Sequence, residues 1–426
     1  MKEKTSKREK IILYLKEILL LSLASSFIVI CYRLLIDNSI NKIYKIFPGI
    51  GFIKIALCLV SFIILTFLVD KITKKVSAAA GSGVTNAIEE YEGLADQDPL
   101  SLIPARFLGG FVSAFVGLPL SKAGPSIHMS AISSKLVGKF LKVDVEEGKK
   151  LMRIAGGLGL CAAFSAPLSG IFFSIENFKG KLQKSYLFIL VLSSFITSLL
   201  TKAFLGSKPF LIVEVYRPLD LKIIAYIGIF SLMGILSGFI FSKTCNFMKK
   251  RVNKGWLSIF IAMAISLTYS LALDFYMGDT KLFSQSLMDK KFSTLGLAVI
   301  AILFLILLGL SYASGAPGGT TVPIIITGLL GAYLLFDLLA GFKLIGREYF
   351  SYIMVLAMAA TFSTVFRTPL CASFLAIELT GAYPILFDCL AVSFIAYYLA
   401  GLIQEQSFFY KTVTDKRKLQ GLGLKD

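Results

Sequence analysis

The stretch Ser121-Lys122-Ala123-Gly124-Pro125-Ser126-Ile127-His128 ends one apolar run of the sequence and opens the next. Pro125 is typical of a first helical turn, where the N–H that proline lacks would have no intrahelical acceptor. A helix that begins among apolar spans leaves unpaired N–H groups with a partial positive charge, which lipid cannot satisfy. Such a start favours an anion, and the stretch holds no carboxylate that would compete for it. We therefore predict an anion pathway through a membrane.

The composition is typical of a polytopic helical membrane protein. Of 426 residues, 56% are hydrophobic and only 16% are charged, whereas soluble domains carry about 25% charged residues. Apolar segments of about the length needed to cross a bilayer recur along the chain. They fall at 17–36, 50–69, 102–119, 124–141, 151–176, 184–204, 219–242, 255–274, 293–311, 319–341, 350–377 and 383–403. Several are short or interrupted by Gly or Pro, which in transporters indicates broken helices at the substrate site.

The basic residues predict the orientation in the membrane. The formal net charge is +18, and lysines and arginines cluster at the chain ends and in the connections 70–75 and 243–254. The positive-inside rule places both termini and these connections in the cytoplasm, with the protein in the cell (inner) membrane. We expect this charge to contact lipid headgroups rather than nucleic acid. Residues 1–16 are predicted to form an interfacial helix on the cytoplasmic side.

The stretch 121–128 and two further interruptions of the apolar runs are called breaks. The two further breaks show the same pattern, in which flexible backbone precedes the start of a helix. Gly81-Ser82-Gly83 precedes a short helix from Val84, and the glycines leave the Ser82 hydroxyl accessible. The segment 313–323 contains two prolines and several small residues, and an apolar run follows it. Each of these breaks is expected to place a helix N-terminus inside the membrane region.

An internal repeat relates the two halves of the chain. Phe164-Ser-Ala-Pro-Leu-Ser-Gly-Ile-Phe-Phe-Ser-Ile-Glu176 matches Phe366-Arg-Thr-Pro-Leu-Cys-Ala-Ser-Phe-Leu-Ala-Ile-Glu378 at six positions without a gap. We expect Glu176 and Glu378 to accept hydrogen bonds from backbone across the repeat, or to lie at an interface. The predicted organisation is a first membrane repeat at 17–204, a linker with the first helix of the second half at 205–250, a second repeat at 251–405 and a C-terminal cytoplasmic helix at 406–426.

The single histidine and the isolated cysteines argue against a metal centre or a disulfide framework. We therefore expect no cofactor and no enzymatic activity, because no paired acids or nucleophile–base arrangement occurs within the spans. His128 falls one helical turn after Gly124. With an ordinary pKa of about 6.5, it is a candidate pH sensor near the anion, or simply a hydrogen-bonded helix residue.

These motifs resemble those of the CLC family of chloride channels and anion/proton antiporters. Gly81-Ser82-Gly83-Val84 is similar to the family's GSGIP element, and Lys122-Ala123-Gly124-Pro125 is similar to its GK/REGP element. Residues 315–323 resemble GAPGGxFxP, with Thr321 at the phenylalanine position. The resemblance implies an all-α CLC-type fold of two inverted repeats with broken and tilted helices. It also implies a homodimer with one pore per subunit and bound chloride ions.

The resemblance further assigns site residues. It implies that the Ser82 hydroxyl contacts the central anion, that Tyr410 closes its inner side, and that Thr320 and Thr321 present backbone N–H groups. Hydroxyl, phenol and amide groups bind a halide without a fixed charge, so the ion can leave again. The implied anion-binding set comprises Ser82, Gly83, Gly124, Gly319, Thr320, Thr321 and Tyr410.

Two departures from the family pattern bear on proton coupling. The family's gating glutamate would stand at Ala123, and its inner proton-transfer glutamate would stand at Asn177. Neither alanine nor asparagine titrates, so the sequence predicts passive chloride flux that is uncoupled from protons. Ser82 favours chloride by resemblance. Fluoride stays open because Thr321 also departs from the third motif.

Two alternatives remain at this stage. The first is a proton-coupled chloride or fluoride antiporter, in which His128 carries the proton or Ala123 is an engineered substitution of a glutamate. The second is an organic-solute secondary transporter, which would need charged substrate-binding residues within the spans. The three breaks offer almost none.

Overall fold

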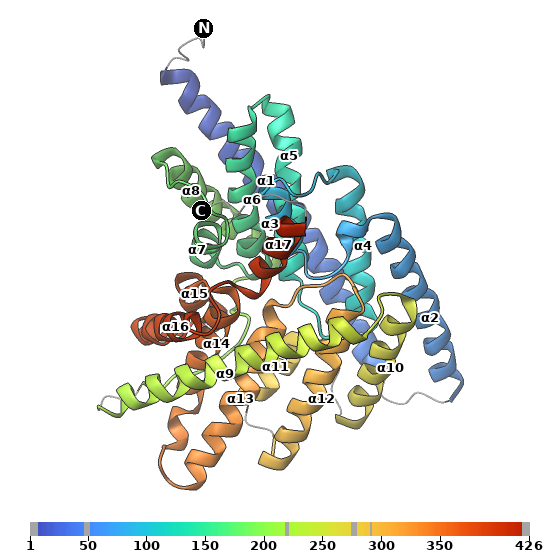
Figure 1. Ribbon diagram of the computed structural model, residues 1–426, viewed down its shortest axis with the longest axis vertical. Helices are drawn as coiled ribbons and strands as arrows, with labels where there is room; N and C mark the ends of the chain where they lie inside the picture. The colour runs from blue at the N-terminus through green and yellow to red at the C-terminus, as the bar shows by residue number, and fades with distance from the viewer. Residues whose placement is uncertain (1–6, 47–51, 218–220, 274–278, 290–291, 420–426) are drawn as a thin grey trace.

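The computed structural model describes residues 7–46, 52–217, 221–273, 279–289 and 292–419. Throughout these ranges the regular structure is helical, apart from an isolated antiparallel bridge between Ser121 and Gly319 (Figure 1). The α-helices are α1 (Lys7–Ile46), α2 (Phe52–Lys75), α3 (Val84–Tyr91), α4 (Pro99–Phe115), α5 (Ala123–Leu141), α6 (Val145–Phe164), α7 (Pro167–Asn177), α8 (Lys184–Leu205), α9 (Lys222–Arg251), α10 (Trp256–Leu273), α11 (Thr280–Met288), α12 (Thr294–Ala313), α13 (Thr321–Gly341), α14 (Phe350–Phe366), α15 (Pro369–Thr380), α16 (Leu386–Gly401) and α17 (Phe408–Leu419). The predicted all-α fold is confirmed.

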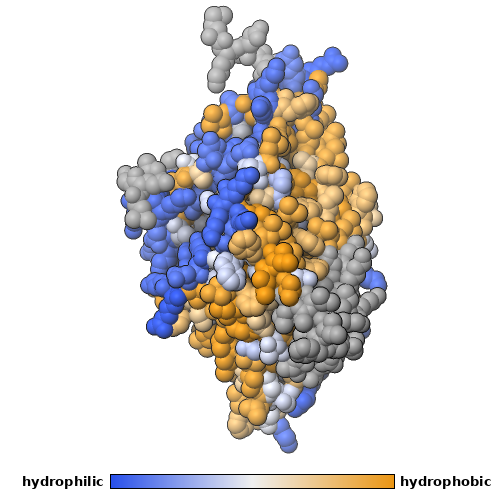
Figure 2. All heavy atoms as spheres, turned by 90° about the vertical axis from the view of Figure 1, so that its right-hand side faces the viewer, coloured by the Kyte–Doolittle hydropathy of each residue, from blue (hydrophilic) through white to orange (hydrophobic). Residues whose placement is uncertain are grey.

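The described helices have the lengths and the surface of a multi-pass membrane protein. Among them, seven are long and apolar enough to cross a bilayer. Three shorter apolar helices, which include α4 and α15, accompany them. Figure 2 shows hydrophilic side chains gathered along one edge of the visible face, whereas hydrophobic side chains cover most of the rest. Large exposed apolar side chains recur on α8, among them Phe188, Phe195 and Leu199. An apolar environment, which either lipid or an adjoining protein surface supplies, accounts for this exposure.

The helices at the two ends of the chain have other bounds than the sequence predicted. Residues 7–16 were expected within a separate interfacial helix, but they form the first turns of α1, which runs without interruption to Ile46. The C-terminal helix expected at 406–426 begins at Phe408, and α17 is described to Leu419. Residues 1–6 and 420–426 lie outside the described residues.

Two predicted spans are each divided by one residue with a left-handed backbone. Ser165, at φ 57°, ends α6, and Arg367, at φ 62°, ends α14. Pro167 and Pro369 then begin α7 and α15, because proline is favoured at a helix start and not in a helix interior. The apolar segments 151–176 and 350–377 are therefore helix pairs and not single spans.

The packing of helices follows the sequence repeat. Helix α1 packs against α5, α6 and α8, and α9 packs in the same way against α13, α14 and α16. The repeat-related Phe172 and Phe374 stack with ring centroids 4.7 Å apart and an interplanar angle of 10°. Helix α9, which the sequence analysis placed in the segment 205–250 before the second repeat, thus packs against the helices of the second half that correspond to the partners of α1. Figure 1 shows α3 and α17 between the two groups of helices.

Glu176 and Glu378 join the repeats reciprocally. The Glu176 carboxylate accepts hydrogen bonds from the N–H groups of Leu370 (3.0 Å) and Cys371 (2.8 Å) at the start of α15. The Glu378 carboxylate accepts from Leu168 (3.0 Å) and Ser169 (2.8 Å) at the start of α7. Each acid therefore caps the equivalent helix of the other repeat, and the prediction of backbone hydrogen bonds across the repeat is confirmed.

We expect Glu378→Gln to lower the free energy of unfolding by about 2 kcal/mol, because the amide retains one acceptor oxygen but turns an NH2 donor toward the N–H groups of α7. Thermal unfolding of the purified protein in detergent measures this change. Glu348→Gln is a suitable control, since Glu348 is exposed and its substitution should stay within about 0.5 kcal/mol. Equal melting of Glu378→Gln and wild type would contradict the capping role.

Candidate anion site

The three breaks are numbered in chain order as the first (residues 81–83), the second (121–128) and the third (313–323). They meet through glycines at a point that we call the junction. A Cβ atom on Gly124 would lie 2.1 Å from the Ser82 carbonyl oxygen and 2.7 Å from the Gly319 Cα. A Cβ atom on Gly83 would lie 2.8 Å from the Gly124 carbonyl oxygen, and the φ of Gly83 is +89°. No side chain larger than hydrogen fits these backbone contacts, so Gly83, Gly124 and Gly319 are required for the breaks to touch.

Backbone hydrogen bonds hold the breaks together. Ser121 and Gly319 exchange N–H···O bonds of 2.7 and 2.6 Å. The Gly81 N–H donates to the Gly315 carbonyl (3.1 Å), and the Gly318 N–H donates to the Gly81 carbonyl (3.2 Å). The third break is therefore bonded to both of the others.

Three helix N-termini converge at this junction. Helices α3, α5 and α13 begin at Val84, Ala123 and Thr321, immediately after the contacts just described. Pro125 and Pro323 occupy the third position of α5 and α13, where a missing N–H costs no intrahelical bond. The unpaired N–H groups and the three dipoles give the junction a positive potential, which favours an anion.

The polar side chains that are predicted as anion ligands at the junction are neutral. Ser82 and Thr320 are buried, with their hydroxyl oxygens 3.5 Å apart. Thr321 is fully buried, and its hydroxyl has no hydrogen-bond partner among the described residues. The fully buried Ala123 donates its N–H to the Ser121 hydroxyl over 3.1 Å. The structure thus brings together six of the residues predicted from sequence, namely Ser82, Gly83, Gly124, Gly319, Thr320 and Thr321, with Ala123 beside them.

Two cavities reach the junction. The Lys122 cavity, of about 720 Å³, is lined by Ser121, Lys122 and Val322, among others. Within it, Lys122 forms an ion pair with Asp37 of α1. The Ser82 cavity, of about 170 Å³, is lined by Gly81 and Ser82 together with Lys249 and Lys254. Each cavity therefore combines backbone of the junction with basic side chains.

Tyr410 lines a different cavity from those that reach the junction. This Tyr410 cavity, of about 570 Å³, is also lined by Asn177 and Glu176. The hydroxyl of Tyr410 and the side-chain NH2 of Asn177 are buried without hydrogen-bond partners among the described residues. Thr412, two residues further along α17, lines the Ser82 cavity instead. The structure therefore brings Tyr410 and Asn177 together in one cavity, whereas the role of Tyr410 at the anion of Ser82 stays a prediction.

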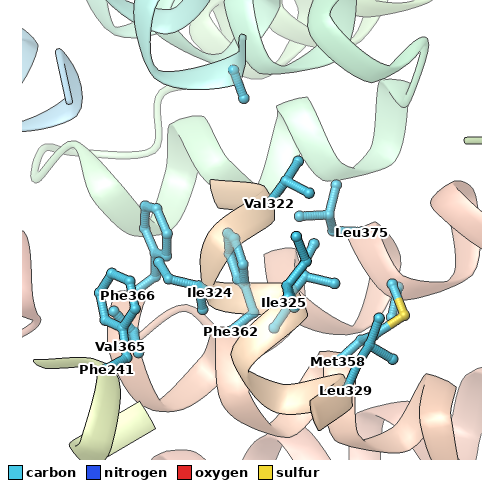
Figure 3. Packing of buried hydrophobic residues seen from close by; sticks show 14 of the residues in the cluster. Phe241, Val322, Ile324, Ile325, Leu329, Met358, Phe362, Val365, Phe366 and Leu375 are labelled. Carbon is cyan, nitrogen blue, oxygen red and sulfur yellow. The ribbon is translucent and has the colours of Figure 1, made fainter. Parts of the chain in front are cut away.

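Aromatic packing fixes the start of α17. The Phe409 ring lies 4.4 Å from the Phe366 ring, which stacks on Phe362 at 4.2 Å. Figure 3 shows these two α14 rings beside Ile324, in the first turn of α13. The apolar core that holds the N-terminus of α13 therefore also positions the residue preceding Tyr410.

His128 is fully buried and lies in the wall of the junction. Its Nε2 is 2.7 Å from Gln97 Oε1, and its Cβ is 3.1 Å from the position of a Cβ on Gly83. The predicted proximity to the junction is confirmed, whereas a role as a pH sensor stays a prediction.

Sequence reasoning missed Arg106, although it is an arginine in an otherwise apolar helix. Its side chain is completely buried, and it donates hydrogen bonds to the backbone of the first break. A charged residue within an apolar segment is the signal that could have identified it.

Comparison with known proteins agrees with this geometry. The model of the family described as "Voltage gated chloride channel" matches residues 57–401. The chain belongs to this family. It is 24% identical over 386 residues to the H+/Cl− exchange transporter ClcA of Vibrio cholerae, which covers 82% of this chain and 77% of that protein. ClcA of Vibrio parahaemolyticus is 26% identical over 368 residues, with 81% and 77% covered.

Solved structures of the same family share the fold. A slow cyanobacterial Cl−/H+ antiporter superposes with a TM-score of 0.80 at 18% identity, covering 96% of this chain and 99% of that one. A CLC-type fluoride/proton antiporter gives a TM-score of 0.75 at 18% identity, covering 95% and 98%. The predicted CLC-type fold of two inverted repeats with broken helices is confirmed.

Proposed function

We propose that this chain conducts chloride passively across the membrane without coupling to protons. The observation that carries the proposal is Ala123, which stands at the start of α5 where the resemblance places a gating glutamate. A methyl group neither binds a proton nor competes with an anion for the N–H groups of the first turn. The anion path is therefore open at this point and has no proton carrier.

Chloride fits the chemistry of the junction. Helix N-termini, the Ser82 hydroxyl and the basic residues of the two cavities all favour a small anion. None of the predicted ligands carries a full charge, which lets a bound halide dissociate. The relatives named H+/Cl− exchange transporters support chloride as the substrate. An organic-solute transporter is disfavoured because the predicted ligands are hydroxyl, phenol and backbone amide groups, and none of them is a charged side chain that would bind such a substrate.

The inner side of the path supports the same proposal. Asn177 replaces the inner proton-transfer glutamate, and it lies with Tyr410 in one cavity. Glu176, the adjacent carboxylate, already accepts two backbone N–H groups of α15. A proton-coupled antiporter, the function of the named relatives, would thus need a carrier other than these residues, such as His128.

We infer that the Ser82 cavity faces the cytoplasm. Lys249 and Lys254 line it, and Asn86 and Glu89 connect it to a neighbouring cavity lined by Lys75 and Lys416. This concentration of lysines at one end favours the inner side of a cell membrane. Both termini are proposed to lie there as well.

We also propose a homodimer with one pore per subunit. Helices α7, α8, α15 and α16 adjoin one another and carry exposed apolar side chains, including Leu168, Phe195 and Phe394. Mass measurement of the detergent-solubilised protein tests this part independently of transport.

In liposomes that contain the purified protein, an imposed chloride gradient should dissipate without net proton movement. A chloride electrode and an internal pH dye measure the two fluxes together, with valinomycin present to balance charge. Protein-free liposomes are the control. Steady proton uptake driven by the chloride gradient would overturn the uncoupled mechanism and favour the antiporter. The assay repeated with nitrate and fluoride identifies the anion, and a preference for fluoride would contradict the proposed substrate.

A further inference from the structure

Gln97, in the connection between α3 and α4, contacts His128 in the wall of the junction. Gln97 Oε1 lies 2.7 Å from His128 Nε2, and both residues are buried. Among the described residues, no other hydrogen-bond partner reaches the imidazole, and His128 Nδ1 has none. The protonation of the only histidine in the sequence therefore depends on the group that Gln97 presents to it.

Every polar group of Gln97 has a partner that fixes its direction. Its backbone N–H donates to the Glu90 carboxylate (2.9 Å), and its carbonyl accepts from Lys135 Nζ (2.8 Å). Its side-chain NH2 donates to the Asn86 carbonyl (3.0 Å). Since a carbonyl oxygen only accepts hydrogen bonds, the NH2 group and not Oε1 must face Asn86. The oxygen of the amide is thereby turned toward His128.

This orientation selects one form of the imidazole. An amide oxygen is an acceptor, so His128 Nε2 must carry the hydrogen of the 2.7 Å bond. In the neutral ring Nδ1 is then bare. A proton on Nδ1 would add a positive charge and a second N–H, and neither has a partner among the described residues. Burial of an unpaired charge is costly, and the geometry therefore favours the neutral ring.

The charged groups around His128 favour the same form. Helices α1, α3, α4, α6 and α13 pack against α5. Arg106 of α4 contacts the same position of the first break as His128 does, and its positive charge opposes a second one there. The acid of α3, Glu90, is already bound by Lys135 and by the Gln97 N–H. Charged side chains of the other three helices bind elsewhere, and these include Arg33, Asp37, Arg153 and Asp337.

We propose that Gln97 is a positioning residue that holds His128 in its neutral Nε2–H form. The wall of the junction then has the same charge throughout the physiological pH range, within which an ordinary histidine changes its charge. His128 thus neither senses pH nor carries a proton toward the anion. This inference deepens the proposed uncoupled function, on which its transport readout rests, because it removes the carrier that the antiporter alternative invokes.

The 15N NMR spectrum of the purified full-length protein, labelled at histidine, tests the proposal. One histidine gives one pair of ring nitrogens, and the protonated and the bare nitrogen of a neutral imidazole resonate far apart. We expect the proton on Nε2 and no titration of either signal between about pH 5 and pH 8. Gln97→Ala removes the acceptor and should no longer hold His128 in this single tautomer.

Gln285→Ala is the matched control for Gln97→Ala. The side-chain amide of Gln285 also donates to and accepts from backbone, in this case the carbonyl and the N–H of Ile212. Its removal should leave both His128 signals as they are in the wild type.

Chloride efflux from liposomes gives the transport readout. His128→Gln keeps an N–H donor near the place of Nε2 but cannot titrate. The ratio of its flux at about pH 5 to its flux at about pH 8 should therefore agree with the wild-type ratio within about twofold. A wild-type flux whose pH dependence disappears in His128→Gln would overturn the proposal, because His128 would then be the titrating group.

The spectra separate the remaining outcomes. A wild-type His128 that titrates within this range, or that carries its proton on Nδ1, would overturn the proposal. An unchanged tautomer in Gln97→Ala would do the same, because Gln97 would then not set it. If Gln97→Ala does not fold, the wild-type spectrum and the pH profile of His128→Gln still decide. Proton uptake driven by a chloride gradient, with a neutral His128 in the spectrum, would instead refute the proposed function and leave the role of Gln97 supported.

Discussion

Introduction of a carboxylate at the start of α5, in Ala123→Glu, is expected to slow chloride flux at least roughly tenfold at neutral pH. The side chain would begin at a fully buried position next to Gly124 and Ser121. Its carboxylate would compete with chloride for the unpaired N–H groups of the first turn. Because it is tethered, its local concentration exceeds that of free chloride at millimolar concentrations. Chloride efflux from liposomes measures the rate.

The chloride flux of this variant should also depend on pH in a definite direction. An ordinary glutamate has a pKa of about 4.3, and only its ionised form competes with the anion. Flux through Ala123→Glu should therefore rise as the pH falls through the pKa of the new carboxyl, whereas the wild type should lack this rise. Ala123→Gln is the matched control, since it has nearly the same size and no charge. Equal slowing by Gln and Glu would show a steric effect, and unchanged flux in Ala123→Glu would refute the position of the pathway.

The helix starts at the junction could be predicted from sequence because they depend on local chemistry. Gly81-Ser82-Gly83 before α3, Pro125 in α5 and Pro323 in α13 each mark a backbone that cannot continue a preceding helix. The reciprocal roles of Glu176 and Glu378 were also foreseen, because the repeat placed an acid at the same position in each half. Sequence spacing alone was sufficient for these features.

Two kinds of feature were missed, namely a contact between distant segments and a local backbone conformation. The ion pair of Asp37 with Lys122 joins residues 85 positions apart, and neither residue has a local pattern that indicates the other. The division of 151–176 into α6 and α7 depends on one left-handed residue, Ser165, which is not a glycine. Hydropathy does not register such a residue, because the apolar character continues on both sides of it.

Arg106 shows a different limit of sequence reasoning. Its position in α4 was visible as a charge in an apolar segment, but the partners of its guanidinium are carbonyl groups of residues 78–81. Backbone acceptors carry no sequence signature, since every residue has a carbonyl group. Only the fold shows that this charge lies behind Ser82.

Gly124→Ala is expected to abolish chloride flux, although it places alanine in a helix. By helix propensity alone, alanine would stabilise α5 by about 1 kcal/mol relative to glycine. The added Cβ atom, however, would lie 2.1 Å from the Ser82 carbonyl oxygen and 2.7 Å from the Gly319 Cα, both of which are backbone atoms. Backbone cannot rotate away as a side chain does, so the first and third breaks must separate from α5. The helix N-termini would then no longer converge on one anion.

Gly148→Ala is the matched control for this prediction. Gly148 is also in a first helical turn, that of α6, but a Cβ atom there would meet nothing within 4 Å. Only the higher helix propensity of alanine then affects stability. The variant should therefore melt at the same or a higher temperature, and its chloride flux should be unchanged. Efflux and thermal unfolding of both variants separate loss of the site from loss of the fold. Normal chloride flux in Gly124→Ala would contradict the junction as the anion site, because the contact between its breaks would then be dispensable.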